Sequence, residues 1–232
     1  MKNLWKFDIP VEGDEAFPTI AELMLLAKQH SQNHEYYDAY CCLKIAAASS
    51  HIPAKYQLAL LCRDTPELPL SQERRYMLSE HLLLDLENTF TKPRELESVY
   101  QELALLYQYK RMPISFIGYQ LRLYHLRQSD IRHLSMIESS INKLDLSKLD
   151  QDPRGVGILG LECLLEPRVQ KIGVYLLREA VNYDDLQGIL ALSLADFLED
   201  NPFIDEDSHT LAAVYKTIAK QRGNPDILRR HS

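Results

Sequence analysis

Helix-length amphipathic segments, separated by prolines and polar caps, run through most of the chain and constrain its fold more than any other feature. In the first such segment, 19–32, apolar residues recur at spacings of three and four, which is the period of one helix face. Pro18, Pro93 and Pro113 stand where segments begin, and proline is well tolerated in the first turn of a helix. The predicted helices span 19–32, 36–50, 53–62, 71–90, 93–109, 113–128, 130–144, 154–165, 169–182, 186–199 and 207–222.

No segment competes as a strand. The run SFIGYQLRLYHL at 115–126 alternates over a few residues, but no hairpin turn stands beside it. Helices joined by short loops indicate an all-α fold of antiparallel helix hairpins stacked in series. The predicted organisation is an N-terminal extension, two sets of helical repeats in one array joined by the linker LDLSKLDQDPRG at 144–155, and a tail. These parts span 1–18, 19–145, 146–223 and 224–232.

Composition and charge exclude several classes of protein. Of the 232 residues, 46% are hydrophobic and 25% are charged, which is ordinary for a globular chain and argues against disorder. The net charge of −7 gives no bulk attraction to nucleic acid or to an anionic membrane. No stretch reaches the roughly 18 apolar residues of a membrane-spanning helix, and charges interrupt the N-terminal sequence MKNLWKFDIPVEGDE before a signal-peptide core can form. We therefore expect a cytoplasmic protein that binds neither nucleic acid nor membrane.

Two segments repeat each other at a constant offset. Residues 38–61 align with 172–195, and every match has the same shift, 173 − 39 = 134. The matched residues are Ala39 with Gly173, Leu43 with Leu177, Ala46 with Ala180, Ala47 with Val181, Ala54 with Gly188, Leu58 with Leu192 and Ala59 with Ser193. Small residues let the two helices of a hairpin approach closely, while the leucines fill the space between neighbouring hairpins. Because one hairpin cannot bury that face alone, further copies must stack on it.

This pattern resembles the Sel1-like repeat family, which is related to the tetratricopeptide repeats. The segment AAASSHIPAKYQLALL looks like that family's junction, in which an alanine pair ends one helix and a small residue with Leu-Ala opens the next. The resemblance covers 39–61 and 173–198 and extends more weakly over 103–127. It departs from the family at Cys62-Arg63 and Gln108-Tyr109, where a glycine is expected after Leu-Tyr. The resemblance implies a curved right-handed α-solenoid, and a role as an adaptor in settings such as bacterial signalling, secretion or host contact.

The segment GVGILG at 155–160 has the form of the dinucleotide-binding fingerprint but lacks its setting. The residues Asp150 to Arg154 form no strand before it, and Glu179 further along lies in a predicted helix. We interpret the glycines as sites of close helix packing. We therefore expect no nucleotide or other cofactor, and a small-molecule ligand is not predicted.

Two groups of residues raise the question of a metal. His30 and His34 have the i, i+4 spacing of a chelating pair, but no carboxylate motif such as HExxH accompanies them. The cysteines include no CxxC, and a chain of this length does not need disulfides. We expect buried thiols in a reducing compartment and no metal site. The four cysteines are Cys41, Cys42, Cys62 and Cys163.

Charge is unevenly distributed along the sequence. From Glu179 to Asp207 there are nine acidic residues and no Lys or Arg, which predicts a solvated face or a docking surface for a basic partner. From 110 to 133 the balance inverts, because five Lys and Arg residues face one acid, Asp130, and tyrosines are interleaved. Basic and aromatic residues suit nucleic acid, but a short patch on an acidic protein favours protein or peptide recognition. Tyrosines buried inside a helical stack are the alternative. The predicted partner-binding residues are Arg111, Tyr119, Arg122, Tyr124 and Arg127.

The sequence carries no local signature of catalysis: it has no nucleophile elbow, no P-loop and no Cys-His pair. We therefore expect a non-enzymatic adaptor or scaffold that binds a protein or peptide partner on a solenoid surface. Two alternatives remain. One is a dedicated chaperone or an inhibitor or immunity protein that neutralises a single partner, and the other is an enzyme with dispersed active-site residues in a deep, closed pocket.

Overall fold

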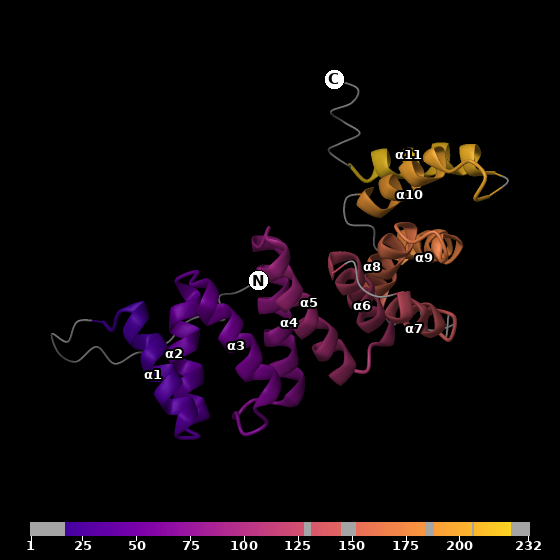
Figure 1. Ribbon diagram of the computed structural model, residues 1–232. Coiled ribbons are helices and arrows are strands. Elements are labelled where there is room, and N and C mark those ends of the chain that lie inside the picture. The colour runs from indigo at the N-terminus through magenta and orange to yellow at the C-terminus, as the bar shows by residue number, and fades with distance from the viewer. Residues whose placement is uncertain (1–16, 128–130, 145–151, 184–187, 206, 224–232) are drawn as a thin grey trace. The chain divides into compact units, whose positions relative to one another are not determined.

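The computed structural model describes residues 17–127, 131–144, 152–183, 188–205 and 207–223. Within these ranges the protein is all-helical, with eleven α-helices and no strand, as predicted (Figure 1). The helices are α1 (Ile20–Gln32), α2 (Tyr36–Ala48), α3 (Ile52–Asp64), α4 (Gln72–Thr89), α5 (Pro93–Tyr109), α6 (Pro113–Arg127), α7 (Ile131–Ile141), α8 (Pro153–Leu164), α9 (Gln170–Tyr183), α10 (Ile189–Asp200) and α11 (Ser208–Gln221).

Local capping determines where several helices begin. Pro93 and Pro113 occupy the first positions of α5 and α6, as their sequence positions predict. Thr19 and Glu22 form a capping box at α1, in which the Thr19 hydroxyl accepts from the Glu22 amide and the Glu22 carboxylate accepts from the Thr19 amide. The hydrogen bond from the Thr19 amide, together with that from its hydroxyl, lowers the pKa of Glu22. Ser71 caps α4 in the simpler way, by accepting from the amide of Arg74.

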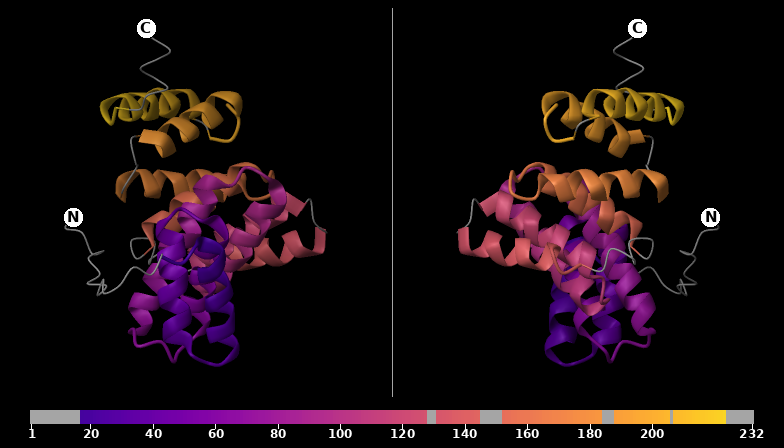
Figure 2. Two further views of the ribbon diagram at one scale, coloured as in Figure 1. Left: turned by 90° about the vertical axis from the view of Figure 1, so that its left-hand side faces the viewer. Right: turned by 90° about the vertical axis from the view of Figure 1, so that its right-hand side faces the viewer.

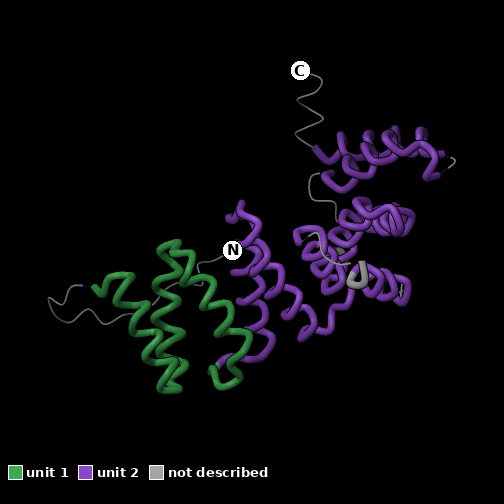
Figure 3. The backbone as a smooth tube through the Cα atoms, viewed as in Figure 1, with its two compact units in different colours: residues 1–69 green, residues 70–232 purple. Residues whose placement is uncertain are grey.

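The chain divides into two compact units, 1–69 and 70–232 (Figure 3). Unit 1 contains α1 to α3, and unit 2 contains α4 to α11. The division at Pro69 differs from the linker predicted at 144–155, which lies inside unit 2. Residues 145–151 of that linker lie outside the described residues, and its C-terminal part, from Pro153, already belongs to α8.

In unit 1, α2 packs against both α1 and α3. The α2–α3 turn is tight, because Ser50 takes a positive φ of 59° and the His51 side chain caps α3 by accepting from the Ala54 amide. Ala46 and Ala54, on either side of this turn, are fully buried. The two helices can therefore approach closely, as the small residues of the repeat predict.

In unit 2, α8 is central and packs against α6, α9 and α10. Helices α4, α5 and α6 pack in sequence, and α10 lies beside α11 (Figure 2). Helix α7 instead packs on α6 to the side of this series, where Leu134, Ile137 and Ile141 join the core formed with α6, α8 and α9. The packing order α4, α5, α6, α8, α9, α10, α11 therefore leaves α7 out of the stack.

The first helices of the two repeated segments begin at equivalent positions, whereas the second helices do not, since α3 begins at Ile52 and α10 at Ile189, and 189 − 52 = 137. Helix α2 begins at Tyr36 and α9 at Gln170, and 170 − 36 = 134 is the shift found in the sequence. The matched leucines Leu43 and Leu177 are both buried, each in the core of its own unit. The other matched positions are buried in both segments except Ser193, which is half-buried.

The glycines of GVGILG lie in α8 at close helix contacts, which confirms their interpretation as packing residues. A Cβ at Gly160 would lie 2.8 Å from Leu177 Cγ, and one at Gly157 would lie 3.0 Å from Leu190 Cδ1. The residue before the helix, Asp152, is its N-cap and accepts from the Gly155 amide at 3.0 Å.

The cysteines are free thiols, but they are not all buried. Cys62 and Cys163 are buried as predicted, whereas Cys41 and Cys42 are half-exposed on α2, so the prediction was wrong for this pair. Across the described part of the chain, every helix is too short or too polar to span a bilayer.

Candidate functional site

The predicted partner surface lies on α6 and at its two ends, and Tyr119 does not belong to it. Tyr119 is 0% exposed, because its ring stacks on Tyr107 with centroids 5.6 Å apart and packs against Tyr100 at 5.7 Å. Burial raises the pKa of the Tyr119 phenol well above its usual range, and its hydroxyl donates to Glu87 at 2.9 Å. The prediction that Tyr119 contacts a partner is therefore wrong, and the tyrosine-in-the-core alternative holds at this position.

Arg122 is likewise occupied inside unit 2. Its guanidinium pairs with Glu87 of α4 through Nη1 and with Glu162 of α8 through Nε, the latter at 2.8 Å. Its side chain is only 20% exposed and lies over the rings of Tyr100 and Tyr119. Burial opposes the charged form, but the two carboxylates outweigh it and raise the pKa of Arg122. Arg122 is thus engaged in ion pairs inside unit 2.

Neighbouring helices also supply acids to Lys110, His125 and Arg127. Lys110 pairs with Glu80 of α4, which also accepts from the Tyr107 hydroxyl at 2.8 Å. His125 lies 3.0 Å from Glu162, and Arg127 pairs with an acid of α5, Glu97, at 2.8 Å. The local excess of positive charge that suggested a docking surface is therefore largely neutralised within unit 2.

Sequence analysis missed these acids because they lie far away along the chain. Glu87 precedes Arg122 by 35 residues and Glu162 follows it by 40. Within their own helices they have the pattern of ordinary solvated charges, so no local signal marks them as partners of α6.

The other predicted residues do not form one surface with each other. Arg111 is exposed at the α5–α6 corner, where it takes a positive φ of 56° and lines a hollow of about 330 Å³ with Phe116. Arg127 lies at the opposite end of α6, which has 15 residues and is therefore about 22 Å long. Tyr124 is half-buried and packs against the core. Arg111 and Arg127 remain accessible, but they are too far apart to act as a single site.

The acidic segment presents a different feature, an aromatic ring in solvent. Phe203, in the loop between α10 and α11, is 99% exposed. The loop is hydrogen-bonded: the Asp205 amide donates to the Ser208 hydroxyl at 3.2 Å, and the Asp205 carboxylate pairs with Arg178 of α9 at 2.8 Å. Hydrogen bonds, first from the Asp207 amide and then from Arg178, lower the pKa of Asp205. Residues 184–187 and 206 of this segment lie outside the described residues.

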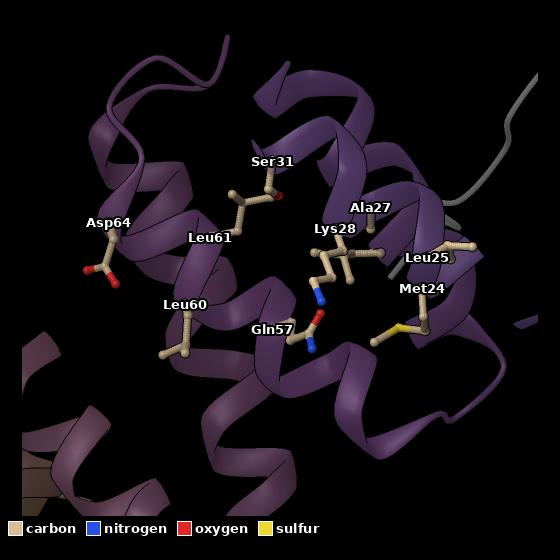
Figure 4. Close-up of a pocket in the computed structure, with 10 residues that line it drawn as sticks. Met24, Leu25, Ala27, Lys28, Ser31, Gln57, Leu60, Leu61 and Asp64 are labelled. Atoms are coloured by element: carbon tan, nitrogen blue, oxygen red, sulfur yellow. The ribbon is translucent and has the colours of Figure 1, made fainter. Parts of the chain in front are cut away.

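Unit 1 carries an open groove (Figure 4). It has a volume of about 670 Å³ and lies between α1 and α3, with Leu43 of α2 also contributing. Figure 4 shows Met24 and Lys28 of α1 facing Gln57 and Leu61 of α3 across this space. The complete lining is Met24, Leu25, Ala27, Lys28, Ser31, Leu43, Gln57, Leu60, Leu61 and Asp64.

The groove combines apolar surface with one uncompensated cation. Leu25 is 56% exposed, whereas a leucine of this size gains free energy when it is removed from water. Lys28 makes no ion pair or hydrogen bond among the described residues. The carboxylate of Asp64 is already engaged, since Arg63 donates to both of its oxygens at 2.7 and 2.9 Å. The groove therefore presents exposed apolar side chains beside one ammonium group.

One signal in the sequence pointed to this groove. The apolar face of the first helix is wider than a single helix contact requires, and of its residues only Leu23 and Ala27 are buried. Leu25 and Leu26 remain exposed beside them. The sequence shows this excess of apolar surface on a short helix, but it does not indicate which neighbouring helix lies beside it.

Comparisons of the chain with protein-family models, with curated proteins and with solved structures give no match. The likeness to Sel1-like repeats therefore rests on the repeated residues themselves and on their equivalent burial in α2–α3 and α9–α10.

Proposed function

We propose that this chain is a non-enzymatic protein-interaction module, an adaptor whose α1–α3 groove binds an amphipathic segment of a partner protein. The observation that carries the proposal is the groove itself, which is open, mostly apolar and lined mainly by side chains of α1 and α3. Recognition of an amphipathic helix in such a groove uses apolar anchors at helical spacing. The equivalent starts of α2 and α9 and the matched burial of the repeated residues support a further part of the proposal, a Sel1-like right-handed solenoid. Such arrays present extended binding surfaces.

The groove is open and lies between α1 and α3, so the occupant that we propose is a helical segment. Helix α1 has 13 residues and is therefore about 20 Å long, which matches about four turns of a partner helix. A partner helix of that length presents two or three apolar anchors on one face. The four free thiols support a cytoplasmic setting for this interaction.

Lys28 indicates which charge the bound segment is expected to carry. The exposed ammonium beside Leu25 and Met24 is available to a carboxylate on the edge of a bound helix. A rim charge of this kind contributes to specificity and to the association rate more than to affinity. We therefore propose that the bound segment has an apolar face flanked by Asp or Glu.

The test is selection of peptides from a displayed library of helical sequences on the full chain, followed by calorimetric titration of the selected peptide. We expect an apolar consensus with an acidic flank. Leu25→Arg should weaken binding at least tenfold, about 1.4 kcal/mol, because it places a charge on the apolar wall. Lys28→Glu should weaken binding of the acidic peptide and favour a version in which that acid is replaced by Lys.

The matched control is Ile45→Arg. Ile45 is exposed to a similar degree on α2 but does not line the groove, so this variant should bind like the wild type. Selection of no peptide, or equal affinities for the wild type, Leu25→Arg and Lys28→Glu, would remove the groove as the binding site.

A further inference from the structure

Three potential metal ligands converge where α1 ends and α2 begins. His30 lies in the last turn of α1, Glu35 is the N-cap of α2, and Asp38 lies in the first turn of α2. One ligand atom from each lies within 4.8 Å of the others. The His30 Nδ1 atom lies 2.6 Å from Glu35 Oε2.

The backbone holds the three residues in this arrangement. The amide of Glu35 donates to the carbonyl of His30 at 2.8 Å, and His34 between them takes a positive φ of 62°. Glu35 and Asp38 are three residues apart, so they project from the same side of α2. The junction therefore presents the ligands without requiring rearrangement of either helix.

The ion pair between His30 and Glu35 does not account for Asp38. The Asp38 carboxylate makes no hydrogen bond or ion pair among the described residues, although it lies beside a second carboxylate. Two neighbouring carboxylates repel each other in the absence of a cation, and a divalent ion between them removes that repulsion.

We propose that His30, Glu35 and Asp38 form a binding site for a divalent transition-metal ion of the zinc class. An imidazole with two carboxylates suits Zn²⁺, Co²⁺ or Mn²⁺ better than Ca²⁺ or Mg²⁺, which prefer oxygen ligands alone. Ligand atoms around a tetrahedral zinc ion lie roughly 3.4 Å apart. Small rotations of the exposed Glu35 and Asp38 side chains are enough to reach that spacing, and water completes the coordination.

This site differs from the one suggested by the spacing of the histidines. His34 turns to another partner, since its Nδ1 atom lies 2.7 Å from the hydroxyl of Tyr36. It is not part of the three-residue group. The metal would join the end of α1 to the start of α2, and it would stabilise unit 1 as any ligand of the native state does.

The test uses the metal-free full chain titrated with CoCl₂ under reducing conditions, and then with ZnCl₂ in competition. We expect saturable binding of one Co²⁺, with the visible absorption of nitrogen and oxygen ligation, and displacement by Zn²⁺. Changes outside the ligand set of metal sites weaken affinity about 10- to 100-fold. Loss of a ligand in His30→Gln or Asp38→Asn should therefore weaken binding at least about tenfold.

The control is His34→Asn, which preserves a residue tolerant of positive φ and should bind Co²⁺ like the wild type. Binding that is lost in His34→Asn, or that is unchanged in both ligand variants, overturns the proposal. A thiolate-to-cobalt charge-transfer band assigns the ion to Cys41 and Cys42 and also overturns it, as does the absence of saturable binding.

Discussion

At the scale of single residues, the role of a charged side chain depends on which charged groups of other helices lie beside it. Arg122 belongs to a basic stretch of sequence, yet it lies between Glu87 and Glu162 from two other helices. Both carboxylates are largely buried, as is the guanidinium. The three groups therefore depend on one another, because removal of one leaves an uncompensated charge in a poorly solvated place.

Arg122→Met should consequently destabilise the folded protein. It keeps most of the aliphatic stem but removes the guanidinium from Glu87 and Glu162, which retain only the Tyr119 hydroxyl and His125 as partners among the residues that the structure describes. We expect a loss of about 3 kcal/mol in the free energy of unfolding, the lower end of the range for a broken buried pair, because part of the side chain is solvated. Urea denaturation followed by circular dichroism measures this loss.

Arg111→Met is the matched control for this substitution. Arg111 is exposed, and no ion-pair partner is found for it in the described part of the chain, so its free energy of unfolding should change by less than about 0.5 kcal/mol. Equal losses in the two variants would contradict the structural role of Arg122.

Residue-level predictions from sequence were accurate where the cause is local. The small residues Ala46 and Ala54 were expected at a close helix crossing and are fully buried, because periodicity alone determines which face they occupy. The acid partners of Arg122 and Lys110 could not be predicted, since they depend on which helices become neighbours. His30 is a different case, because Glu35 and Asp38 follow it closely in the sequence, and their convergence depends on the turn between α1 and α2.

At the scale of helices, the ends were predictable because caps and prolines act within one turn. Thr19, Ser71 and Pro93 mark the starts of α1, α4 and α5 as expected. The side position of α7 was not predictable, because its apolar face has the same period as that of a stacked helix.

Packing between α8 and α9 depends on glycine: a Cβ at Gly173 would lie 2.9 Å from Cys163 Cβ and 3.0 Å from the carbonyl oxygen of Gly160.

Gly173→Ala tests this close packing through the sign of its effect. In an open helix the change from Gly to Ala stabilises by roughly 0.5–1 kcal/mol. At Gly173 the added methyl group meets backbone that cannot move independently, so we expect destabilisation by about 1–3 kcal/mol in urea denaturation. The comparison is Gly157→Ala, whose methyl group meets only the end of the Leu190 side chain, where the two effects should nearly cancel. A stabilised Gly173→Ala variant would show that α8 and α9 are less closely packed.

At the scale of the whole molecule, the division into units depends on which helices share one hydrophobic core. The periodicity of apolar residues in the sequence does not show which helices share a core. The segment from Pro66 to Ser71 reads as an ordinary break between helices, comparable to several others. It nevertheless separates the two compact units, whereas the more polar stretch 144–155 lies within one of them. Because α6 packs on α8, the core of unit 2 continues from one side of that stretch to the other.

Two compact units should lose stability independently. Leu43 and Leu177 hold equivalent repeat positions, one in each unit, and both are buried. Truncation of a buried leucine to alanine costs about 2–5 kcal/mol. Leu43→Ala should therefore accelerate amide hydrogen exchange in α1 to α3 while α4 to α11 exchange at the wild-type rate, and Leu177→Ala should produce the opposite pattern. Mass spectrometry of peptic fragments from the intact chain resolves the two regions. Faster exchange throughout the chain in both variants would mean that the helices form a single cooperative array, as in a solenoid whose neighbouring repeats are strongly coupled.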